Sequence, residues 1–76
     1  MPDEQGDIRT EHKREIIERE IALWKNTRYQ GEIRARAGKQ AGDQEYAARG
    51  LADVERSEKM LDALNALLHD LPGEEP

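Results

Sequence analysis

Basic side chains gather between residues 25 and 39, where they could bind phosphate groups. Against the single acidic residue Glu32, this stretch contains Lys25, Arg28, Arg34, Arg36 and Lys39. Such a cluster suits a nucleic acid. Glu32 lies four residues from both Arg28 and Arg36, however, which is the spacing of an ion pair within a helix. The net charge of -5 also opposes a polyanion, so RNA or DNA binding through this stretch is kept as an alternative.

Few residues suit catalysis or metal binding. The chain has no cysteine, which excludes thiol nucleophiles, disulfides and thiolate metal sites. Ser57 is the only serine, and we predict it to lie between helices with no histidine nearby. His12 and His69 would need further ligands, such as Glu15 or Asp70, to hold zinc. We therefore expect a protein that is not an enzyme, with no catalytic residue, metal or cofactor.

Composition and length limit the class of protein. A chain of 76 residues forms one domain with a small core. No apolar run approaches the ~20 residues needed to span a bilayer, and residues 1–10 are polar and acidic, unlike a signal peptide. With cysteine absent as well, we expect a cytoplasmic protein that does not bind membranes.

Helix-forming residues dominate the chain and predict an all-α fold. Ala, Leu, Glu, Arg, Lys and Gln are frequent and phenylalanine is absent. We predict an antiparallel hairpin: a first helix over about 8–40, a turn at 41–43 and a second helix over about 44–71. The residues that we expect to cap these helices are Asp7 or Thr10 for the first and Asp43 for the second. Residues 1–7 and 72–76 are predicted to be disordered acidic tails.

Two rows of residues with alternating spacings of three and four predict how the helices pack. The first row is Ile17, Ile21, Trp24, Arg28, Gly31, Ala35 and Gly38, and the second is Ala47, Gly50, Val54, Ser57, Leu61, Leu64 and Leu68. In a hairpin, facing residues have numbers that add to a constant, and here every facing pair adds to 85. The midpoint of that sum places the reversal between Gly42 and Asp43, which are good turn residues.

This register gives the glycines of the first helix a role in packing. Gly31 and Gly38 face Val54 and Ala47, so the helices can approach closely near the turn. The larger side chains of both rows then form the core at the open end. Glycine inside a helix costs about 1 kcal/mol relative to alanine, so a packing gain is expected in return. The alternative is that residues 31–42 form a flexible loop.

Arg28 is the one charged residue of the two rows, and it faces Ser57. We expect the aliphatic part of Arg28 to pack between the helices. Its guanidinium group would then reach Glu32 or Glu58 and fix the register of the helices.

One flank of the predicted hairpin is apolar and the other is charged. The charged flank holds Glu18, Lys25, Glu32, Lys39 and Glu58, and the apolar flank holds Ile16, Leu23, Met60 and Leu67. A single two-helix hairpin this small is expected to need a partner to offset the conformational entropy lost on folding. We predict a homodimer in which the apolar flanks join two hairpins into a four-helix bundle. Scattered surface residues are the alternative.

A second apolar strip is predicted on the outer surface of the first helix. It consists of Tyr29, Ile33 and Arg36, and tyrosine and arginine are residue types that often contribute most to protein interfaces. This strip could contact another protein, form the dimer in place of the first flank, or simply be solvated. The leading hypothesis is a small accessory or inhibitor protein that acts through protein–protein interaction. Besides nucleic-acid binding, one further alternative is that this acidic protein occupies the nucleic-acid-binding surface of a basic partner.

Overall fold

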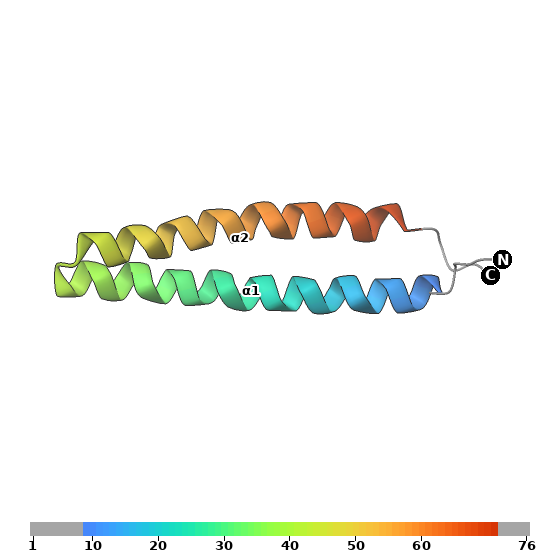
Figure 1. Cartoon of the computed structure of the whole chain (residues 1–76), viewed down its shortest axis with the longest axis horizontal. Helices are drawn as coiled ribbons and strands as arrows, with labels where there is room; N and C mark the ends of the chain where they lie inside the picture. Colours follow the sequence, from blue (N-terminus) through green and yellow to red (C-terminus); the bar gives the residue numbers. More distant parts are fainter. Residues whose placement is uncertain (1–8, 72–76) are drawn as a thin grey trace.

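Two antiparallel helices make up the part of the chain that the computed structural model describes, residues 9–71. Helix α1 spans Thr10–Ala41 and helix α2 spans Gln44–Asp70. They lie side by side along their lengths and are joined by a short turn, which we call the tip (Figure 1). The all-α hairpin predicted from the sequence is confirmed. The predicted tails, residues 1–7 and 72–76, lie outside the described residues.

Burial follows the two predicted rows. The residues that are buried within 9–71 are Ile21, Gly31, Ala35 and Gly38 on α1 and Ala47, Gly50, Ser57 and Leu61 on α2. Contacts between the backbones confirm the predicted register near the tip. A methyl group added to Gly38 would meet Ala47, and one added to Gly31 would lie 3.0 Å from Val54. Both pairs have residue numbers that add to 85.

The hairpin is tight at the tip and wider at its open end, as the small residues predicted. A Cβ atom built on Gly50 would lie 2.5 Å from the Gly31 carbonyl oxygen and 2.6 Å from the Ala35 nitrogen. The two backbones therefore touch where Gly31, Ala35 and Gly50 meet. Away from the tip the ribbons separate (Figure 1). Larger side chains fill that wider space, with Ile21 and Leu61 buried there. A loop over residues 31–42 is excluded, because α1 continues to Ala41.

Gly42 and Asp43 form the turn. Gly42 has φ 74°, a left-handed conformation that favours glycine. Its N–H donates to the Lys39 carbonyl oxygen and the Asp43 N–H donates to the Gly38 carbonyl oxygen, which is the Schellman arrangement at the end of a helix. The Asp43 carboxylate then accepts a hydrogen bond of 3.0 Å from the Tyr46 N–H and caps α2. The predicted cap at Asp43 is confirmed.

The start of α1 differs from the prediction. Arg9 is the N-cap residue, its side chain makes no capping hydrogen bond, and Thr10 is already helical. The proposal that Thr10 caps this helix is therefore wrong, and Asp7 lies outside the described residues. Glu11, in the first turn, still places negative charge at the positive end of the helix dipole. At the other end of the hairpin, Leu71 is extended, as expected of a residue that precedes proline.

Neither helix is a candidate membrane span. Over residues 9–71, no helix is both long enough and apolar enough to cross a bilayer.

Candidate protein-interaction surface

The apolar flank, defined as Ile16, Leu23, Met60 and Leu67, lies largely open to solvent in the hairpin. Leu23 is 59% exposed, Leu67 is 55% exposed and Ile16 is 39% exposed. Met60 is half-buried. The sequence thus located large aliphatic side chains that the two helices do not cover themselves.

The core that the helices enclose is small by comparison. Among residues 9–71 the buried apolar side chains are Ile21, Ala35, Ala47 and Leu61, of which two are alanines. Only two large apolar side chains are therefore buried, while the other large apolar residues of the packing rows are half-buried: Ile17, Trp24, Val54, Leu64 and Leu68. At about 25 cal/mol per Å² of apolar surface removed from water, such a core contributes little, and covering the apolar flank would add to it substantially.

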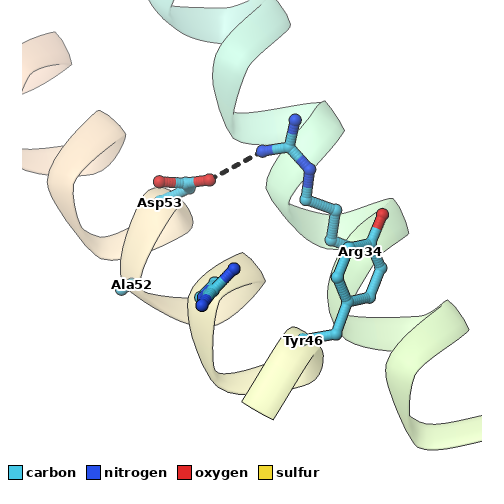
Figure 2. A pocket seen from close by; sticks show the side chains of 5 residues that line it. Arg34, Tyr46, Ala52 and Asp53 are labelled. Carbon is cyan, nitrogen blue, oxygen red and sulfur yellow. Dashed lines mark hydrogen bonds and ion pairs between the residues drawn. The ribbon is translucent and has the colours of Figure 1, made fainter. Parts of the chain in front are cut away.

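An ion pair between the helices lies at the end of the apolar flank that is nearest the tip. Arg34 Nη1 lies 2.8 Å from Asp53 Oδ2, and the two side chains are 42% and 38% exposed. Figure 2 shows the Arg34 side chain reaching from α1 to Asp53 on α2. Tyr46 and Arg49 line the same surface hollow. Three of its lining residues are charged, Arg34, Arg49 and Asp53, in contrast with the apolar residues nearer the open end.

A cation–π contact between the two helices lies beside the apolar flank. The guanidinium carbon of Arg56 lies 5.6 Å from the centre of the Trp24 ring, within the range of a favourable interaction. Trp24 is half-buried. Its ring therefore packs partly between the helices and partly under Arg56. The spacing of Trp24 predicted its place in the core but not its contact with Arg56.

The outer face of α1, defined as Tyr29, Ile33 and Arg36, is exposed as predicted. Tyr29 is 61% exposed and Ile33 is 49% exposed. Arg36 is also exposed, and none of the ion pairs among residues 9–71 includes it. Because Tyr29 and Ile33 are four residues apart in a helix, they lie on neighbouring turns of the same face.

The five basic residues of the alternative hypothesis do not form one free patch. Arg34 is held by Asp53. Lys25 and Arg28 line a surface hollow together with Glu58 and Asp62. Lys39 and Arg36 are exposed. Carboxylates therefore lie beside several of these cations, which lowers the positive potential available to a polyanion.

Arg28 departs from its predicted contacts. It is half-buried between the helices, as expected for a residue of the packing row. Within residues 9–71, no ion pair joins it to Glu32 or Glu58. The predicted pairing is wrong. The ion pair between the helices comes instead from Arg34 and Asp53, one position outside the packing rows.

The residues considered for catalysis or metal binding have structural contacts. Ser57 is fully buried, and its hydroxyl donates a hydrogen bond of 2.7 Å to the Asp53 carbonyl oxygen. His12 Nδ1 lies 3.5 Å from Glu15 Oε1. His69 lines a different hollow with Arg14 and Leu68. Over residues 9–71, no three potential metal ligands group together.

Two exposed apolar side chains were not predicted from the sequence. Leu51 is 53% exposed and Tyr46 is 41% exposed. Leu51 lies seven residues before Glu58, so both belong to the flank that was described as charged. Heptad spacing alone could have found it. Tyr46 lies two heptads before Met60 and continues that row towards the tip.

Comparison with known proteins finds no relative. No protein-family model, no curated protein and no solved structure matches the chain.

Proposed function

We propose that this protein is a non-enzymatic interaction module that works as a homodimer of α-hairpins in the cytoplasm. The apolar flank joins the two copies into a four-helix bundle. The outer face of α1 then contacts another protein, for which this one acts as an accessory protein or an inhibitor.

The exposure of the apolar flank is the observation that supports the proposal. Leu23 and Leu67 are each more than half exposed, although full burial of a leucine side chain is worth about 1.5–3 kcal/mol. They come from different helices and share a flank with Ile16 and Met60. A second copy would cover all four residues at once, as facing helices do in a four-helix bundle. The covered surface would be the same on both copies, as two-fold symmetry requires.

Sedimentation of single-site variants tests the dimer. Leu23→Glu places a charge in the apolar flank at an exposed position, so the helix can form but the interface is disrupted. We expect the wild type to sediment as a dimer at micromolar concentration and Leu23→Glu to sediment as a monomer. Leu51→Glu is the matched control, because Leu51 is about equally exposed but lies on the opposite flank.

Two results would contradict the dimer. One is a wild-type protein that sediments as a monomer with full helicity at every concentration up to about a millimolar. The other is an equal loss of association in Leu23→Glu and Leu51→Glu, because the apolar flank would then have no special role. Circular dichroism of each variant confirms that the helices are retained.

The outer face of α1 is tested by comparing captured proteins. Wild type, the double variant Tyr29→Ala with Ile33→Ala, and the control Tyr46→Ala would each be immobilised in an extract of the native cell. We expect a specific protein to be retained by wild type and by the control and to be lost from the double variant. A folded double variant that retains every partner of the wild type would remove the outer face of α1 from the proposal.

A further inference from the structure

The apolar flank occupies only the open half of the hairpin. Its α2 residues belong to a row with heptad spacing, which reads Tyr46, Asp53, Met60 and Leu67 from the tip outwards. The row is apolar at Met60 and Leu67, but at Asp53 it carries the ion pair to Arg34. On α1 the row of Ile16 and Leu23 continues towards the tip as Gln30 and then Ala37, so no large apolar side chain follows Leu23. The surface that a second copy could cover with apolar contacts therefore ends before the tip.

We propose that the second copy binds antiparallel and staggered, so that the open halves overlap and the two tips point in opposite directions. This inference rests on the proposed function, since it assumes that the apolar flank binds a second copy. It adds the geometry of the complex, and it leaves both tips free in the assembled protein.

Two arrangements with two-fold symmetry bring the apolar flank against itself. In the parallel one, the symmetry axis runs along the hairpins and each tip lies beside the other tip. In the antiparallel one, the axis crosses the hairpins near the middle of the apolar flank. With 1.5 Å of rise per residue, that middle lies roughly 33 Å from the turn. Apolar contacts alone do not distinguish the two arrangements.

The charged residues of the hollow near the tip favour the antiparallel arrangement. In the parallel dimer, the hollow lined by Arg34, Arg49 and Asp53 would face its own copy. The two hollows together would hold four arginines against two aspartates, and an ion pair whose side chains are now about 40% exposed would lose water. Desolvating charges in this way is costly unless new partners replace the water. In the staggered dimer, the hollow lies beyond the overlap and stays hydrated.

One pair of opposite charges beside the apolar flank, Arg56 and Asp70, favours the same arrangement. Arg56 lies on the tip side of the flank, where it covers Trp24. Asp70 lies at the end of α2, on the other side of the flank. With the axis at the middle of the flank, Arg56 lies roughly 13 Å from the axis and Asp70 roughly 8 Å on the opposite side. Antiparallel copies bring these opposite charges within about one helical turn of each other. Parallel copies place each α2 against α1 of the other copy and keep Arg56 and Asp70 apart.

Distances between spin labels test the arrangement. The sequence has no cysteine, so a single introduced cysteine gives one label per chain. Gln40→Cys places the label at the tip, and Arg19→Cys places it near the expected axis; both positions are exposed. For Gln40→Cys, we expect a separation on the order of 60 Å in the staggered dimer and below about 30 Å in the parallel one. Arg19→Cys should give a short distance in either dimer.

The two labels separate failure of the inference from failure of the proposed function. A short distance at Arg19→Cys with a long distance at Gln40→Cys supports the staggered dimer. Short distances at both positions overturn it but leave a dimer through the apolar flank. If neither label gives a dipolar signal and both proteins sediment as monomers, the proposed dimer fails and the inference fails with it.

Discussion

Gly50 lies so close to α1 that even one added methyl group would meet backbone atoms. The nearest would be the Gly31 carbonyl oxygen and the Ala35 nitrogen, at 2.5 and 2.6 Å. Neither atom can move without displacing α1. At the residue scale, the fold thus depends on glycine at position 50, because any larger residue would prevent the two helices from approaching so closely.

Gly50→Ala tests this directly, because two effects oppose each other. Alanine favours a helix over glycine by about 1 kcal/mol, but overpacking costs about 1–3 kcal/mol, and a clash with backbone belongs at the upper end. We expect the free energy of unfolding to fall by about 2 kcal/mol. Urea unfolding at a fixed protein concentration measures it. A variant more stable than wild type would show that the helices do not pack as closely at Gly50.

Arg34 and Asp53 provide a second test at this scale. Both side chains are more than a third exposed, so we expect their coupling in a double-mutant cycle to be only about 0.5–1 kcal/mol, and lower at high salt. The control cycle is Glu45 with Arg49, which are 3.9 Å apart and far more exposed. Its coupling should not exceed about 0.5 kcal/mol. Equal coupling in the two cycles would contradict a specific bridge between the helices.

At the scale of the helices, the sequence predicted the turn and the register but not every contact. Gly42 and Asp43 were identifiable because a left-handed residue and a side-chain cap each favour particular residue types. The packing rows were identifiable because apolar and small residues recur with helical spacing. Arg34 and Asp53 lie outside those rows, and among many surface charges nothing in the sequence distinguishes the two that meet. The partners predicted for Arg28 were wrong because the sequence likewise does not show which carboxylate a given arginine meets.

The helix starts give a matched pair of variants. Asp43→Ala removes the carboxylate that accepts from the Tyr46 N–H, and we expect it to lower the free energy of unfolding by about 1 kcal/mol. Thr10→Ala should change it by less than about 0.5 kcal/mol, because Thr10 is inside the helix and does not cap it. Thermal or urea unfolding of both variants measures the difference. A larger loss from Thr10→Ala than from Asp43→Ala would contradict the assigned caps.

The candidate site was predictable only as far as spacing places residues on a face. The exposure of Leu23, Leu67, Tyr29 and Ile33 followed from their positions outside the packing rows. The limit of the apolar flank did not follow, because it is set by the ion pair at Asp53. The cation–π contact of Arg56 with Trp24 depends on side-chain conformations that periodicity does not specify.

At the scale of the whole molecule, Glu20 lies among the apolar residues, three residues from Leu23 and four from Ile16. In the staggered dimer the symmetry axis passes near this position, so two Glu20 carboxylates approach each other. Like charges at close range oppose association. We expect Glu20→Gln to lower the dissociation constant by about threefold to tenfold, measured by sedimentation equilibrium. Unchanged or weaker association would place the axis elsewhere.

The central claim is that one hairpin has too small a core and that a second copy completes it. The thermal midpoint as a function of protein concentration tests this most directly, because association stabilises the folded state by mass action. Circular dichroism at 222 nm would be followed from about one micromolar to about one hundred micromolar. We predict that the midpoint rises steadily over this range, by several degrees. A midpoint that stays constant while the helices are fully formed would contradict the claim.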